Sequence, residues 1–96
     1  VSGGENIHPT EVEDVLLAHP HVADVGVVGT PDEEWGEVVT AYVQADGTID
    51  ADELDAWCRD SEDLADFKRP REYAFVDEIP RNPSGKIMRY RLRDRD

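Results

Sequence analysis

Two valine-rich runs of strand length constrain the fold of this chain most strongly. They cover residues 22–29 and 37–44, and branched side chains of this kind pack well on a pleated surface. Residues 30–36 lie between them, contain a proline and a glycine, and read as a turn that carries one tryptophan, Trp35. We therefore expect two strands that pair around this connection.

Helical patterns flank these runs. In residues 8–18, Pro9 suits the first helical position and three acidic residues in the opening turns face the positive end of the helix dipole. The same segment repeats apolar residues at i, i+3 and i+4, which predicts one buried stripe made of Val12, Val15 and Leu16. Further along, Asp50 and Glu53 form a capping-box pattern ahead of a helix expected to bury Leu54, Trp57 and Cys58.

The remaining pattern completes a small α+β layer structure. Residues 60–66 are polar and read as a loop, residues 72–76 as a third strand, and residues 88–95 as a short basic helix. The 96 residues suffice for one domain with a modest core. The expected fold is a small three-stranded sheet with flanking helices.

Length and cysteine content limit the kind of protein and the cellular compartment to which this domain can belong. No run of about 18 apolar residues is present, so no membrane span is expected. The single cysteine, Cys58, excludes an internal disulfide and fits a reducing compartment such as the cytoplasm. Because the sequence opens without methionine, we expect it to be a fragment of something longer.

Charge is distributed unevenly along the chain. Residues 1–66 hold 18 acids and one base, and residues 67–96 hold 5 acids and 9 bases, so nets of −17 and +4 give the total of −13. This asymmetry predicts a small anionic ligand that meets the basic tail alone. Nucleic acid is not expected as a partner, because the acidic body would repel a long phosphate chain.

The size of the acid excess supports a separate hypothesis. Acidic residues outnumber basic ones 23 to 10. Salt screens the self-repulsion of such a surface, so the composition fits a domain adapted to a saline cytoplasm. The alternative is an ordinary acidic domain.

One loop carries a candidate functional group. Lys86 is one of only two lysines, the other being Lys68, and it follows the segment Pro80-Arg81-Asn82-Pro83-Ser84-Gly85. Proline and glycine bend and expose the backbone there. A lysine on such a loop is a mobile point charge that can reach a phosphate or carboxylate oxygen, whereas Lys68 is expected to be a surface charge.

Four motifs, taken together, resemble the C-terminal domain of the adenylate-forming enzymes, which include acyl-CoA and aryl-CoA synthetases and peptide-synthetase adenylation domains. The resemblance runs from Val1 to about Arg93. Its motifs occur in the family's order and spacing, and they are residues 2–13, residues 32–37, residues 67–70 and residues 80–86. It implies a small mobile lid domain that serves two half-reactions in turn.

The resemblance assigns Lys86 to the first half-reaction. A carboxylic acid attacks the α-phosphate of Mg-ATP there, and a cation that bridges the two anions offsets their repulsion and aligns the attack. The motifs name no metal ligand in this chain. Arg89, Arg91, Arg93 and Arg95 are expected to form a solvated basic helix or part of the domain interface.

The second half-reaction transfers the acyl group to coenzyme A. By the same resemblance, the segment lining the pantetheine tunnel is Ser2, Gly3 and Gly4, and Glu5 meets the N-terminal domain. The aryl-CoA synthetases further imply contacts to the CoA nucleotide from Trp35, Phe67, Arg69 and Arg71. Guanidinium groups suit its phosphates, and aromatic rings suit adenine or the pantetheine arm.

These expectations leave three readings of the chain. The first is the C-terminal domain of an AMP-forming acyl-CoA synthetase, whose N-terminal ATP- and acid-binding domain and hinge lie outside this chain. The second is the corresponding part of an adenylation domain that loads a carrier protein. The paired Arg69 and Arg71 favour free CoA over a carrier, which lacks the adenosine phosphates. The third is a non-catalytic acidic interaction module.

Overall fold

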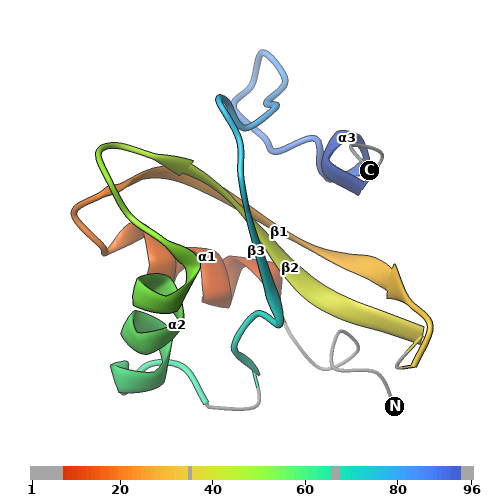
Figure 1. The fold of residues 1–96 in the computed structure, drawn as a ribbon. Coiled ribbons are helices and arrows are strands. Elements are labelled where there is room, and N and C mark those ends of the chain that lie inside the picture. Colours follow the sequence, from red (N-terminus) through yellow and green to blue (C-terminus); the bar gives the residue numbers. More distant parts are fainter. Residues whose placement is uncertain (1–7, 35, 66–67, 94–96) are drawn as a thin grey trace.

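The computed structural model describes residues 8–34, 36–65 and 68–93 (Figure 1). Its elements follow the order α1 (Pro9–Leu17), β1 (Val22–Asp32), β2 (Gly36–Ala45), α2 (Ala51–Asp60), β3 (Glu72–Phe75) and α3 (Arg89–Arg93). The expected α+β fold with a three-stranded sheet is confirmed. Within the described residues, no helix has the length and apolar character needed to cross a bilayer.

The sheet has β2 at its centre. β1 and β2 run antiparallel in a long register from Val22 opposite Ala45 to Asp32 opposite Gly36. β3 joins the other side of β2 in parallel, from Thr40 opposite Glu72 to Val43 opposite Phe75. Because parallel neighbours need a crossover connection, α2 lies between β2 and β3 in the chain.

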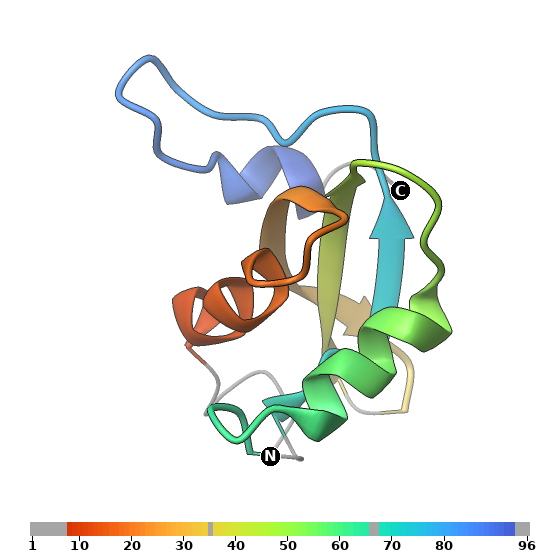
Figure 2. The ribbon, with the colours of Figure 1, turned by 90° about the vertical axis from the view of Figure 1, so that its left-hand side faces the viewer.

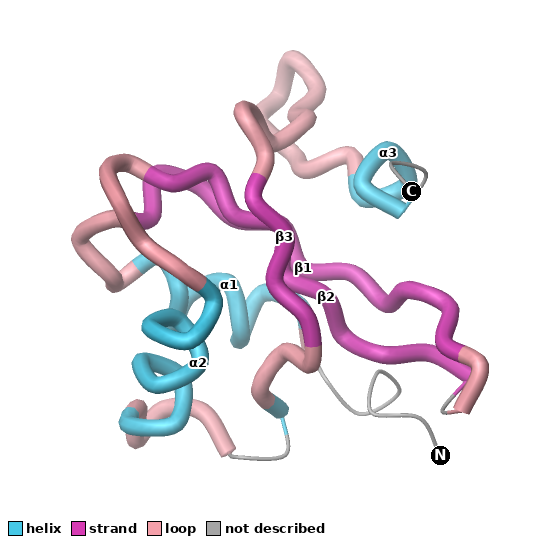
Figure 3. Tube along the Cα trace, in the orientation of Figure 1, coloured by secondary structure: helices cyan, strands magenta, loops and turns pink. Residues whose placement is uncertain are grey.

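Helices α1 and α2 cover one face of the sheet (Figure 3). Alternate strand residues point toward them, and together they form the larger core cluster, in which Val12, Leu16, Val25, Leu54 and Cys58 have no exposed surface. The stripe expected on the first helix is therefore confirmed. Burial of such side chains is the main source of stability for a sheet layered against helices.

The opposite face carries a smaller core cluster, made of Val28, Tyr42, Ile79 and Leu92. Leu92 of α3 is fully buried, and it packs where β1 carries a glycine, Gly26. Both faces of the sheet are thus covered, which explains why adjacent residues such as Val27 and Val28 are both buried although their side chains point to opposite faces.

The second helix is capped as the sequence indicates. The Asp50 side chain accepts a hydrogen bond from the Glu53 amide at 2.8 Å. The Glu53 carboxylate does not complete the reciprocal half of a capping box, because it pairs with Nε2 of buried His19 at 3.1 Å. Trp57 is half-buried rather than buried, and its indole N–H donates to the Val15 carbonyl at 2.8 Å, which ties α2 to α1.

The first strand is longer than its sequence pattern predicts. It continues through Pro31 to Asp32, so most of the expected turn is strand. Proline is tolerated in β1 because this strand lies at the edge of the sheet, where a missing amide donor breaks no interior ladder. The third strand ends at Phe75, one residue earlier than predicted.

Candidate functional site

Lys86 lies on a hairpin-like loop between β3 and α3. The two arms of this loop are held by hydrogen bonds from the Met88 amide to the Pro80 carbonyl and from the Asn82 amide to the Lys86 carbonyl, each 2.9 Å long. An antiparallel bridge pairs Arg81 with Ile87 between them. The loop extends away from the sheet (Figures 1 and 2). The Lys86 side chain on it is exposed.

The tip of this loop is fixed by one asparagine. Oδ1 of Asn82 accepts hydrogen bonds from the Ser84 amide at 3.1 Å, the Ser84 hydroxyl at 2.8 Å and the Lys86 amide at 2.9 Å. The Gly85 amide donates to the Asn82 carbonyl at 2.8 Å, which closes a β-turn with Pro83 second and Gly85 fourth. Gly85 has φ of 89°, a conformation open to glycine but strained for other residues. The backbone that carries Lys86 is therefore well ordered by local bonds.

Arg81 attaches this loop to the sheet. Its Nε and Nη2 donate to the two carboxylate oxygens of Asp24 in β1 at 2.8 and 2.7 Å, and its Nη1 donates to the Gly85 carbonyl. The Arg81 hydrogen bonds lower the pKa of the Asp24 carboxyl below its usual value, so that carboxyl stays ionised at neutral pH. Sequence reasoning did not single out either residue.

Arg89 forms a second attachment just after the loop. Its Nη2 donates to the buried Glu13 carboxylate at 2.7 and 2.9 Å, and its Nε donates to the Val27 carbonyl at 3.2 Å. Glu13 also accepts from the Val27 amide at 2.8 Å, and burial raises the pKa of its carboxyl against the opposing effect of these partners. Of the two expectations for Arg89, a solvated helix or a domain interface, the solvated helix is wrong, because Arg89 is half-buried. A second expectation is corrected as well, since the Glu13 carboxylate binds the Val27 amide of β1 and Arg89 rather than facing the start of its own helix.

Arg69 and Arg71 lie together just before β3. They line a surface hollow of about 560 Å³ together with Ala51, Asp52, Asp55, Pro70 and Tyr73. The Arg69 guanidinium pairs with a carboxylate of the domain itself, because its Nη1 donates to both oxygens of Asp55 at 2.7 Å. Arg71 is exposed, and its backbone amide donates to the Val39 carbonyl at 2.8 Å, which fixes its place at the sheet.

The lysine loop and the arginine pair lie at opposite ends of β3 (Figure 1). The structure therefore does not bring the loop that carries Lys86 together with the segment that carries Arg69 and Arg71. Lys68, expected to be a surface charge, instead packs against α1 with only 21% of its side chain exposed, and its Nζ lies 3.0 Å from Oε1 of Glu11. This pair joins the segment before β3 to the first helix.

Six of the expected site residues fall outside the described part of the chain. They are Ser2, Gly3, Gly4, Glu5, Trp35 and Phe67. Their assignments to CoA, pantetheine or the domain interface stay predictions that follow from the family resemblance.

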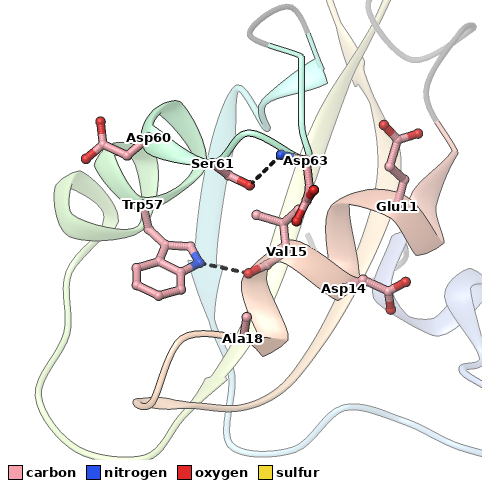
Figure 4. Close-up of a pocket in the computed structure, with 8 residues that line it drawn as sticks. All are labelled: Glu11, Asp14, Val15, Ala18, Trp57, Asp60, Ser61 and Asp63. Atoms are coloured by element: carbon pink, nitrogen blue, oxygen red, sulfur yellow. Dashed lines mark hydrogen bonds between the residues drawn. The ribbon is translucent and has the colours of Figure 1, made fainter.

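A further hollow of about 510 Å³ lies between α1 and α2 (Figure 4). It is lined by Val15, Ala18, Trp57 and Ser61 and by four acidic residues, Glu11, Asp14, Asp60 and Asp63. A lining of this charge disfavours a phosphorylated ligand. Among the described residues, no group of three or more histidine, cysteine, aspartate or glutamate side chains is placed to hold a metal ion.

Comparison with known proteins agrees with this architecture. The sequence model of the AMP-binding enzyme C-terminal domain matches residues 11–86. The 2-succinylbenzoate–CoA ligase of Bacillus licheniformis is 52% identical over 92 residues, which are 96% of this chain and 19% of that protein. The 4-chlorobenzoate–CoA ligase of a Pseudomonas species is 53% identical over 94 residues, covering 96% of this chain and 18% of that protein.

A solved structure gives the same picture. The o-succinylbenzoate CoA synthetase of Bacillus subtilis, in complex with its acyl-adenylate intermediate, superposes with a TM-score of 0.87 at 45% identity, covering 100% of this chain and 19% of that one. The chain thus spans about a fifth of the length of the relatives it matches. With the family model matching most of its residues, the chain belongs to the family of AMP-binding enzyme C-terminal domains.

Proposed function

We propose that this chain works as the C-terminal mobile domain of an AMP-forming CoA ligase. In this role Lys86 serves the formation of an acyl-adenylate, and Arg69 and Arg71 belong to the site for CoA. The observation that carries the proposal is an exposed ammonium on a loop whose backbone is fixed at both arms and at its tip. The relatives are CoA ligases, which supports the reaction class.

The chemistry of adenylation suits a single cation on such a loop. A carboxylate and the α-phosphate of ATP repel each other as they approach, and negative charge grows on the phosphoryl oxygens and on the leaving pyrophosphate. The Lys86 ammonium offsets this charge and holds the two reactants in line. Lysine is suited because its charge is compact and its stem is flexible.

The chemistry of CoA binding suits the arginine pair. Guanidinium groups bind phosphate oxygens in a bidentate manner, and CoA carries a 3′-phosphate and a pyrophosphate on its nucleotide. Arg71 is exposed, and Arg69 is half-buried and pairs with Asp55. A carrier protein offers only a phosphopantetheine arm, so free CoA is the thiol that these residues favour.

The rest of the active site belongs to a partner domain. We propose that an N-terminal domain of the same enzyme holds ATP and the carboxylic acid, and that this acidic domain moves against it. The named relatives act on 2-succinylbenzoate and 4-chlorobenzoate, so these two acids head the panel of substrates to be tried.

A reciprocal pair of variants in the intact enzyme tests the proposal. Lys86→Ala is expected to lower acid-dependent exchange of pyrophosphate into ATP by about 10²–10³-fold, the effect typical of removing one charge-stabilising contact. Thioester formation from supplied acyl-adenylate and CoA stays nearly unchanged in this variant. Arg71→Ala is expected to show the reverse, with a raised KM for CoA and normal pyrophosphate exchange.

Asp14→Asn serves as the matched control, because Asp14 is an exposed carboxylate of α1 outside both the lysine loop and the segment that carries Arg69 and Arg71. Equal losses of both half-reactions in Lys86→Ala would show that its role is wrongly assigned. An unchanged KM for CoA in Arg71→Ala, together with transfer to a phosphopantetheinylated carrier, would favour the carrier-loading alternative.

A further inference from the structure

Arg81 makes three hydrogen bonds, two that link the lysine loop to the sheet and one within the loop. Two of them join its guanidinium to the Asp24 carboxylate, 57 positions earlier in the sequence, and the third joins it to the Gly85 carbonyl. Gly85 directly precedes Lys86. One planar side chain therefore spans from β1 to the residue next to the proposed catalytic lysine.

The geometry of the Arg81–Asp24 contact is typical of strong hydrogen bonds. The two bonds to Asp24 measure 2.7 and 2.8 Å and involve both carboxylate oxygens, so the pair is bidentate and charge-assisted. Asp24 is itself oriented, because its Oδ1 accepts from the Val25 amide at 2.9 Å. This bidentate pair fixes both the orientation of the Arg81 side chain and its distance from Asp24, which a flexible lysine at position 81 could not do.

The loop also has a second anchor on the same strand. Arg89, three residues after Lys86, binds the Val27 carbonyl and the Glu13 carboxylate at the β1 edge. The two arginines thus attach the start and the end of the loop to β1, at Asp24 and at Val27. These two attachments restrict movement of the loop relative to the sheet.

We propose that Arg81 is a positioning residue for Lys86, which holds the loop through Asp24 and the Gly85 carbonyl so that the ammonium reaches the adenylation site in a fixed place. The inference rests on the proposed role of Lys86. It adds a residue that touches no substrate and acts through the backbone next to the lysine.

Fixed placement matters because adenylation depends on alignment. A displacement of about 1 Å in a group that orients reactants can lower a rate about 100-fold, even when the change lies away from the chemistry. The Lys86 side chain has several rotatable bonds, so the position of its backbone determines which points its ammonium can reach. Loss of the Arg81 hydrogen bonds would keep the Lys86 ammonium but would let the backbone that carries it move.

The test uses the intact enzyme and compares Arg81→Gln, Asp24→Asn, Lys86→Ala and the control Asp14→Asn. Pyrophosphate exchange is measured with the most active acid from a panel of 2-succinylbenzoate, 4-chlorobenzoate and hexadecanoate. Thioester formation is measured from the synthetic adenylate of that acid and CoA. Hydrogen–deuterium exchange of the peptide spanning residues 80–88 reports loop order independently of activity.

Arg81→Gln is expected to lower kcat of pyrophosphate exchange by about 10–100-fold, with the KM values for ATP and acid within about threefold of the original. Thioester formation stays within about twofold, and the loop peptide exchanges faster with deuterium. Asp24→Asn acts in the same direction and less strongly, because Arg81 keeps its bond to Gly85. Asp14→Asn behaves as the original enzyme in all three measurements.

Three results separate the possible failures. Arg81→Gln with normal pyrophosphate exchange, alongside an inactive Lys86→Ala, would overturn the inference and leave the proposed function standing. Equal losses of both half-reactions in Arg81→Gln would also overturn it, since that pattern indicates a general structural role. A fully active Lys86→Ala would remove the proposed function itself, and the inference with it.

Discussion

At the scale of single residues, the sequence identified the exposed groups better than the contacts that hold them. The Pro83 and Gly85 pattern predicted a bent, exposed loop around Lys86, because turn residues act locally. The partners of Arg81 and Arg89 lie 57 and 76 positions away in the chain. No local pattern encodes such separations, so sequence reasoning assigned Arg89 to a solvated helix or a domain interface and passed over Arg81.

Gly26 is another residue whose role emerges only from packing. A Cβ atom built there would lie 2.5 Å from Cδ1 of Leu92 and 3.5 Å from Cγ2 of Ile87. A glycine inside a strand often marks a close approach of this kind. Here it lets α3 sit directly on β1.

We therefore expect Gly26→Ala to lower the free energy of unfolding by about 1–3 kcal/mol, the usual result of adding a carbon to a packed core. Urea unfolding of the enzyme measures the change. The double variant Gly26→Ala with Leu92→Val is expected to be less destabilised than the sum of the two single changes, because the shorter side chain makes room for the added methyl. Simple additivity would contradict the direct contact.

At the scale of helices and strands, the type of each element followed from the sequence and the ends were less well predicted. Periodicity and capping identified α1 and α2, and valine-rich runs identified β1 and β2. The first strand runs past its predicted end because an edge position tolerates Pro31. The parallel placement of β3 beside β2 depends on the crossover through α2, which local propensity does not specify.

The capping of α2 gives a prediction at this scale. Asp50→Ala removes the acceptor of the Glu53 amide and is expected to destabilise the domain by about 0.5–2 kcal/mol. Thermal unfolding followed by circular dichroism measures the loss. Asp52→Ala is the matched control, since Asp52 is an exposed acidic residue of the first helical turn that does not occupy the N-cap position. A loss of the same size in both variants would argue against a specific cap.

At the scale of the whole molecule, the chain separates two kinds of positive charge. The loop with Lys86 and the segment with Arg69 and Arg71 lie at opposite ends of β3, while the acidic hollow between α1 and α2 takes a third position. The sequence predicted the basic C-terminal third, yet gave no means of telling how its charges are distributed in space. That distribution depends on the sheet order, in which β3 pairs with β2 alone.

The acidic excess leads to a prediction for the whole molecule. With a net charge of −13, self-repulsion opposes folding at low ionic strength, and added salt screens it. We expect the melting temperature to rise when KCl increases from about 0.1 M, where the Debye length is about 10 Å, to about 1 M, where it is about 3 Å. Sucrose at matched osmolality is the control. A melting temperature independent of salt would remove the hypothesis of adaptation to a saline cytoplasm.

The burial of Cys58 has a practical consequence. Cys58 has no exposed surface, its sulfur accepts a hydrogen bond from the Tyr73 hydroxyl at 3.7 Å, and burial raises the pKa of this thiol. Maleimide dyes react with accessible thiolates, so they should spare the native cysteine of this sequence. A thiol introduced in place of exposed Tyr90 on α3 would then be the group within this domain that accepts a dye, and fluorescence could test whether the domain changes position between the two proposed half-reactions.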